Sequence, residues 1–330
     1  MKLNSGQIRC SPRTRFACVP LYSKPHAPKI KSVATASPTP TRIPPARSQT
    51  KPLPKRPNPL DLWHLLSLDG PTVAALWTWF IASTNHIHLP ATSIAAMFVA
   101  VWTLYAADRL LDARLLSVHP FDAGNLEARH YFHHRQRSSF IAGVLLASIA
   151  LAILLPHLTP EAVRLYLILG GFVFAYFVLI HVSQSAHRLP KEFAVGICFA
   201  AATFIPTVSR QPHLRLSLIT PAALFAALCS LNCLFIFAWE HDSGHNNAHP
   251  TTRVAVHYLP QLAAVVAAVG VGLCFLDRRT PWHVAAACTV SLVILQLLHH
   301  YRRQIPPVTL RAAADLALTT PLLLLPFLPR

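Results

Sequence analysis

Long apolar runs separated by short polar stretches dominate the chain after residue 65. Each run approaches or reaches the roughly 20 residues that a helix needs to cross a bilayer. The strict alternation of a half-buried strand is missing, and in its absence only helices satisfy every backbone group in lipid. The expected spans are residues 68–84, 90–108, 138–155, 162–182, 191–208, 219–239, 257–276, 281–299 and 308–328. The pattern predicts an all-α, polytopic membrane bundle of about nine transmembrane helices.

Composition supports a membrane protein over a water-soluble one. Of the 330 residues, 53% are hydrophobic and only 12% are charged. A soluble domain carries about 25% charged residues, so this chain has about half the usual supply. That shortfall excludes a water-facing globule of this size.

The first 62 residues differ from the rest. Residues 1–60 hold 12 Lys and Arg residues and no Asp or Glu, among many Pro, Ser and Thr residues. Such a segment cannot bury enough apolar surface to offset its ordering entropy, so we expect a disordered basic tail over residues 1–62, followed by the membrane domain over residues 63–330. A basic, Ser-rich, acid-free leader is similar to an organelle transit peptide, with a plain disordered arm as the alternative. Contact with anionic lipid headgroups explains the tail's charge, and no nucleic-acid partner is expected.

The distribution of basic residues predicts the orientation. With nine spans, the tail shares one side with the loops that follow even-numbered spans. After residue 60, that side collects 11 of the 17 Lys and Arg residues. By the positive-inside rule, this side and the N-terminus face the cytoplasm, at the cell inner membrane, or the equivalent compartment if the tail directs the chain to an organelle membrane.

Acidic residues are scarce and lie in two pairs. Asp108 and Asp112 close the second span, and their spacing of four places both carboxylates on one helix face. Glu240 and Asp242 close the sixth span. Both pairs end even-numbered spans, so the topology puts them on the same side of the membrane.

Two carboxylate pairs at one membrane face repel each other unless a cation lies between them. Mg²⁺ is bound in this way, by one or two carboxylates together with phosphate oxygens. Basic side chains nearby hold the remaining phosphate charge through charge-assisted hydrogen bonds. The basic residues on the predicted side are Arg109, Arg114, Arg129, Arg135, Arg188 and Lys191. The alternative is that each acid pairs with a neighbouring Arg at the interface.

These features resemble the UbiA superfamily of intramembrane prenyltransferases. The family's first motif reads N-D-x-x-D-x-x-x-D, and residues 108–114, D-R-L-L-D-A-R, are similar to its second half. Leu104 and Tyr105 stand where the motif has Asn and its first Asp. The second motif, usually D-x-x-D or D-x-x-x-D, is represented by Glu240 and Asp242 alone.

The resemblance implies a helical bundle with a central cavity open to lipid. It also implies Mg²⁺-dependent transfer of a polyprenyl group from its diphosphate to a small or lipid acceptor within the membrane. Asp108 and Asp112 would hold one Mg²⁺, and Glu240 and Asp242 would complete that site or hold a second ion. Tyr105 could shield the allylic cation with its ring face, with packing as the alternative.

Histidine patterns suggest a rival enzyme class. The stretch 129–135 contains H-x-x-H-H, and His241, His245 and His249 are spaced by four. These resemble the histidine boxes of membrane di-iron desaturases and hydroxylases, in which imidazoles bind iron. The usual order of boxes is reversed and the third box is missing, so headgroup contact is the simpler interpretation. A third hypothesis is an inactive relative that binds an isoprenoid.

Two further acids have local interpretations. Asp69, just before Pro71, is typical of a residue that caps a helix start. Asp315 lies within the ninth span, four residues after Arg311, and this spacing favours an ion pair along one helix.

Overall fold

Helices account for the regular structure of every described stretch of the chain. The computed structural model describes residues 58–116, 136–182, 190–240, 249–276 and 281–328. The α-helices are α1 (Pro59–Leu65), α2 (Asp69–Thr84), α3 (Ala91–Leu116), α5 (Arg137–Leu154), α6 (Pro160–Val182), α7 (Lys191–Arg210), α8 (Ile219–Glu240), α9 (Pro250–His257), α10 (Leu259–Leu276), α11 (Trp282–Tyr301) and α12 (Pro307–Leu316). Four 3-10 helices accompany them: η2 (Leu155–His157), η4 (Pro212–Arg215), η5 (Arg302–Gln304) and η6 (Ala317–Phe327). No strand occurs within these stretches, and the all-α prediction is confirmed for them.

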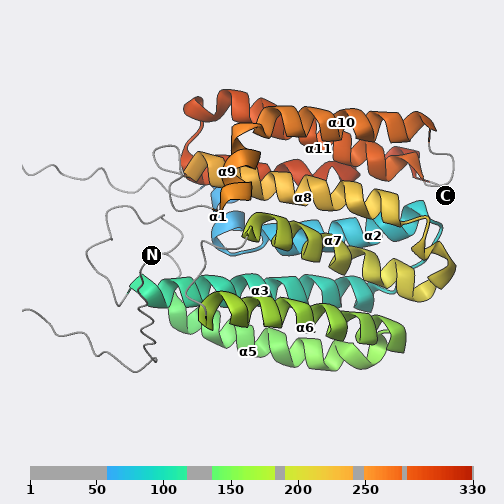
Figure 1. The fold of residues 1–330 in the computed structure, drawn as a ribbon. Coiled ribbons are helices and arrows are strands. Elements are labelled where there is room, and N and C mark those ends of the chain that lie inside the picture. Colours follow the sequence, from blue (N-terminus) through green and yellow to red (C-terminus); the bar gives the residue numbers. More distant parts are fainter. Residues whose placement is uncertain (1–57, 117–135, 183–189, 241–248, 277–280, 329–330) are drawn as a thin grey trace, which may run out of the picture. The chain divides into compact units, whose positions relative to one another are not determined.

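The long helices lie side by side along a common direction (Figure 1). Seven are long and apolar enough to cross a membrane, or eight if α1 and α2 count as one bent span. The seven are α3, α5 with η2, α7, α8, α10, α11 with η5, and α12 with η6. Helix α6, of 23 residues, covers the fourth expected span. These apolar helices indicate a multi-pass membrane protein, whereas nine spans, a central cavity and the orientation stay predictions.

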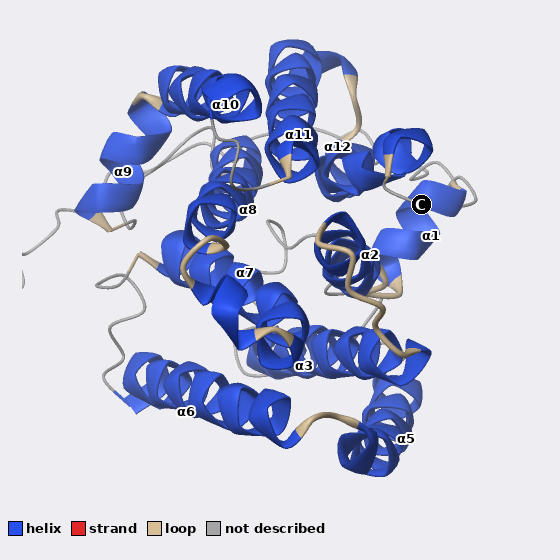
Figure 2. Ribbon diagram, turned by 90° about the vertical axis from the view of Figure 1, so that its right-hand side faces the viewer, coloured by secondary structure: helices blue, strands red, loops and turns tan. Residues whose placement is uncertain are grey.

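The first span begins with a sharp bend. Helices α1 and α2 meet at 89°, through an elbow formed by residues 66–68. Within the elbow, Ser67 has a φ of 60°, in the left-handed region that residues other than glycine adopt only where their surroundings hold them. The bend sets α1 at nearly a right angle to α2, and α1 packs against α12 beside it (Figure 2).

The last span changes from an α-helix to a 3-10 helix because of its prolines. Helix η6 contains Pro321 and Pro326. In the 3-10 pattern the carbonyl of Leu318 would accept from the N–H of residue 321, which proline lacks. The indole of Trp77 donates to this carbonyl instead, at 2.7 Å. At the other end of η6, His283 Nε2 donates to the carbonyl of Phe327 at 2.7 Å.

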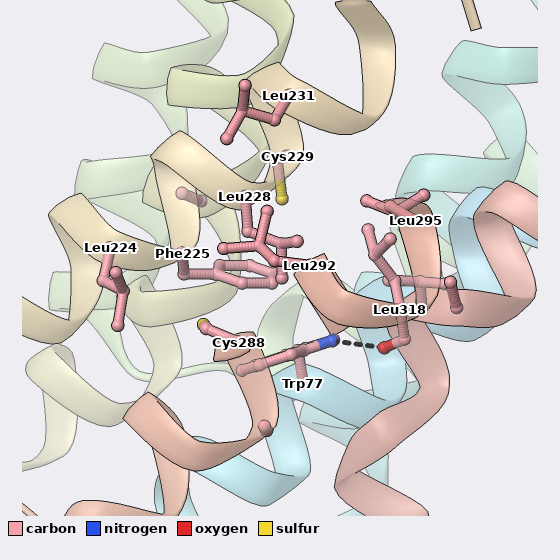
Figure 3. Close-up of a cluster of buried hydrophobic side chains, with 14 of the residues drawn as sticks. Trp77, Leu224, Phe225, Leu228, Cys229, Leu231, Cys288, Leu292, Leu295 and Leu318 are labelled. Carbon is pink, nitrogen blue, oxygen red and sulfur yellow. Dashed lines mark hydrogen bonds between the residues drawn. The ribbon is translucent and has the colours of Figure 1, made fainter. Parts of the chain in front are cut away.

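The apolar core lies where α2, α8, α11 and η6 meet (Figure 3). Trp77 and Phe225, both fully buried, stack with ring centroids 4.1 Å apart. Aromatic pairs of this kind contribute about 0.5–1.5 kcal/mol, and in a bundle surrounded by lipid the core is held by van der Waals packing. The core therefore fixes α2 against the C-terminal span.

The outer helices show the opposite character. Only 6% of the apolar window of α5 and 17% of that of α10 are buried within the described structure. Leu145 and Leu146 on α5 are 61% and 68% exposed. Contiguous apolar surface of this kind is unfavourable in water and is typical of helices that face lipid.

Candidate functional site

The predicted acidic residues lie at the ends of α3 and α8. Helix α3 continues past the predicted end at residue 108 to Leu116, so Asp108 and Asp112 share one helix as expected. Asp108 is exposed, and the side chain of Asp112 is outside the described part of the structure. Glu240 is the last residue of α8 and forms an ion pair with Arg311 of α12. Asp242 lies outside the described residues.

The predicted basic and aromatic residues have different surroundings. Arg109 is buried, whereas Lys191, the first residue of α7, is exposed. Tyr105 lies inside the bundle, against the start of α2: a Cβ built at Gly70 would be 2.5 Å from its Cζ. Arg114 belongs to α3, but its side chain is not among those described. Arg129, Arg135 and Arg188 lie outside the described residues.

Arg109 and Asp69 are part of a buried polar cluster. His64 Nδ1 and Asp69 Oδ2 are 2.5 Å apart, and Arg109 Nη2 lies 3.5 Å from the same Asp69 oxygen. Arg109 Nη1 donates to the carbonyl of His64 at 2.7 Å and to Ser67 Oγ at 3.0 Å. His64, Asp69 and Arg109 are 1%, 0% and 7% exposed. One guanidinium thus stabilises the elbow and compensates the buried carboxylate beneath it.

The last span contributes the second carboxylate of the cluster. Asn232 Nδ2, from α8, donates to Asp315 Oδ1 at 3.1 Å. Asp315 Oδ2 lies 3.9 Å from His64 Nδ1. The polar cluster, defined here as His64, Ser67, Asp69, Arg109, Asn232 and Asp315, therefore joins the start of α2 to α3, α8 and α12.

The structure corrects the prediction that Asp69 caps a helix. Helix α2 begins at Asp69, its N-cap position is Leu68, and no side chain caps it. Asp69 Oδ1 accepts from the backbone N–H of Gly70 at 2.9 Å, and Asp69 Oδ2 faces His64 and Arg109. The signal for this role was present in the sequence, because an acid within or beside a membrane span is expensive unless it has a function or a partner.

Arg311 and Asp315 also differ from the local interpretation. The ion pair that the structure gives Arg311 is with Glu240 of α8. Asp315 has Asn232 and His64 as its neighbours. Helix α12 is therefore joined to α8 by two polar contacts, and Thr309 Oγ1 adds a third contact by donating to Asp61 of α1 at 2.9 Å.

The polar cluster can bind a cation or transfer a proton. His64, Asp69 and Asp315 each offer one ligand atom, and these atoms all lie within 4.8 Å of one another. Ionisable groups gathered inside a membrane bundle mark ion, proton or substrate sites more often than purely structural contacts.

The histidine boxes fall mostly outside the described part of the chain. His130, His133, His134, His241 and His245 are among the residues not described. His249 is described, and its Nδ1 accepts from the backbone N–H of Thr251 at the start of α9. That contact caps the start of α9. His249 therefore adds no support to the di-iron hypothesis.

Comparison of the chain with protein-family models, curated proteins and solved structures found no match.

Proposed function

We propose that the chain is an intramembrane transferase that moves a polyprenyl group from its diphosphate to an acceptor in a Mg²⁺-dependent reaction. The site lies at the end of the bundle where α3 and α8 end. Asp108 and Asp112 bind the cation, and Glu240 and Asp242 contribute from α8. The membrane supplies the polyprenyl substrate directly to this site.

One observation carries the proposal. The two segments with acidic motifs lie at the same end of the bundle and are linked by polar contacts. Arg109, directly after Asp108, binds Asp69, whose partner His64 lies 3.9 Å from Asp315. Asp315 in turn accepts from Asn232, two turns before Glu240 on α8.

The charges at this end suit a diphosphate. As the carbon–oxygen bond breaks, negative charge gathers on the departing diphosphate, and a divalent ion with cationic side chains stabilises it. Lys191 is exposed at the start of α7, and Arg311 is positioned by Glu240. The guanidinium of Arg109 contacts His64, Ser67 and Asp69 of the polar cluster. We therefore propose that Arg109 positions the site and does not bind the phosphate groups.

The experiment is Mg²⁺-dependent binding of farnesyl and geranylgeranyl diphosphate to the full chain in detergent. Asp108→Asn and Asp112→Asn remove a charged ligand and should each weaken binding about tenfold or more. Pyrophosphate release in the presence of candidate acceptors should fall with them.

The matched control is Glu161→Gln, which removes a carboxylate at the start of α6, far along the chain from the proposed site. This variant should bind the diphosphate like the unaltered chain. Equal binding by all three variants, or binding that ignores Mg²⁺, would rule out the transferase site.

A further inference from the structure

We infer that His64, Asp69 and Asp315 form a binding site for a divalent transition-metal ion of the Zn²⁺ class. This site uses other residues than the carboxylates of the proposed Mg²⁺ site, and it does not depend on the proposed function.

The donor set fits such an ion. One imidazole nitrogen and two carboxylate oxygens converge within 4.8 Å of one another. Zn²⁺ binds imidazole nitrogen and carboxylate oxygen at about 2.0–2.2 Å, so an ion can bind all three atoms once His64 Nδ1 and Asp69 Oδ2, which are 2.5 Å apart, separate to admit it. An imidazole ligand suits Zn²⁺ and the other later transition-metal ions better than it suits Mg²⁺.

A second observation points to a ligand at the same place. Asn232 is 5% exposed, and while its Nδ2 donates to Asp315, its Oδ1 has no hydrogen-bond partner. A buried carbonyl oxygen left unpaired is unfavourable, because it has lost its hydrogen bonds to water. Oδ1 belongs to the same amide group as Nδ2, so rotation of the Asn232 amide would turn Oδ1 towards Asp315 and offer it as a further ligand to an ion there.

The charge of the cluster also favours a bound cation. Among the described residues, the ion-pair partners of the two carboxylates include Arg109, at 3.5 Å from Asp69 Oδ2, and His64, at 2.5 Å from Asp69 Oδ2 and 3.9 Å from Asp315 Oδ2. Arg311 has Glu240 as its ion-pair partner. The two carboxylates therefore lie close together in the polar cluster, and a cation bound between them would reduce their mutual repulsion.

The ion would join two distant parts of the chain. Its ligands come from α1, from the start of α2 and from α12, across 246 positions between Asp69 and Asp315. Bound metal would hold the elbow against the last span, and the apolar core beneath would then be closed at this end.

The test uses the full chain in detergent, without an oligohistidine tag. The protein is treated with a chelator, then titrated with Zn²⁺ and with Co²⁺, whose visible spectrum reports its ligands. We compare the unaltered chain with His64→Gln, Asp315→Asn and the control Asp61→Asn. Asp61 is the matched control because it also connects α1 to α12 but lies outside the polar cluster.

The expected result is one tight Zn²⁺ equivalent in the unaltered chain and in Asp61→Asn, with a rise in Tm on binding. His64→Gln and Asp315→Asn should lose that equivalent, with affinity weakened more than about 100-fold. Equal zinc content in all four proteins would overturn the inference, and so would the absence of binding by the unaltered chain.

The chain has 19 histidines, so zinc bound elsewhere must be distinguished. X-ray absorption of the zinc-loaded unaltered chain does this without any variant, even if a variant fails to fold. A shell of one imidazole with oxygen ligands supports the site, whereas two or more imidazoles would overturn it. None of these measurements uses Mg²⁺ or a diphosphate, so failure here is distinguishable from failure of the transferase proposal.

Discussion

The polar side chains at the two ends of the bundle are arranged in contrasting ways. At one end, Asp69 and Arg109 are 0% and 7% exposed and contact each other inside the polar cluster. At the other, Glu161 accepts from Arg215 at 2.7 Å, with side chains 31% and 51% exposed. Surface pairs of the second kind contribute about 0–1 kcal/mol, whereas removing one partner of a buried pair costs about 3–5 kcal/mol.

The contrast distinguishes charged groups that are buried to form a site from charged groups that remain exposed to solvent. The exposed pair at the start of α6 needs no explanation beyond an interfacial charge contact. The buried cluster takes charged groups from four helices out of water, and such an arrangement persists in membrane proteins where it serves a site. The end of the bundle with the cluster is therefore the end where chemistry is to be sought.

The largest expected effect is that of Arg109→Ala. The substitution leaves Asp69 buried without its guanidinium and removes the donors to His64 and Ser67 in the elbow. We expect a loss of about 3–5 kcal/mol in the free energy of unfolding. Unfolding in mixed detergent and denaturant measures it, with Arg215→Ala as the comparison. A loss no larger than that of Arg215→Ala would contradict the distinction between the two ends.

Gly70→Ala should have the next largest effect. A Cβ at Gly70 would lie 2.5 Å from Tyr105 Cζ, so the ring must move away from the start of α2. Overpacking of this kind costs about 1–3 kcal/mol. The control is Gly170→Ala in α6, where a Cβ meets nothing within 4 Å. Alanine there should stabilise the helix by up to about 1 kcal/mol, and a Tm change of the same sign in both variants would refute the explanation.

The smallest effect should come from Glu161→Gln, which removes the exposed pair. We expect at most about 1 kcal/mol, decreasing as salt is added because the charges are solvated. Tm measured at low and high ionic strength checks this. If Glu161→Gln lowered the stability as much as Arg109→Ala does, the exposed pair would matter as much as the buried cluster, and the proposed difference between the two ends would be wrong.

The helices were predictable because each depends on a local property. An apolar run of sufficient length fixes a span, and the observed bounds of α2, α7, α8 and α11 lie within about two residues of those expected. The end of α3 was placed too early, because the apolar run stops near Asp108 while the helix continues through charged residues to Leu116. Helix α1, with seven residues, is too short to be recognised from periodicity.

The candidate site was less predictable because its contacts are not local. From the sequence, Asp69 is expected to cap a helix start and Asp315 to pair with Arg311, so both residues are expected to have local contacts. Their observed partners include Arg109, 40 positions from Asp69, and Asn232, 83 positions from Asp315. Only the packing of α2, α3, α8 and α12 brings these groups together, and no spacing rule along one helix encodes it.

The 3-10 geometry of η6 also changes how far the last span extends. A 3-10 helix rises about 2.0 Å per residue against about 1.5 Å for an α-helix, so its 11 residues cover about 22 Å instead of about 17 Å. Together with the 10 residues of α12, the segment reaches about 37 Å, which exceeds the roughly 30 Å hydrocarbon thickness of a bilayer. The two prolines therefore lengthen this helix without adding residues. Winding it into a regular α-helix would draw the Phe327 carbonyl about 5 Å away from His283.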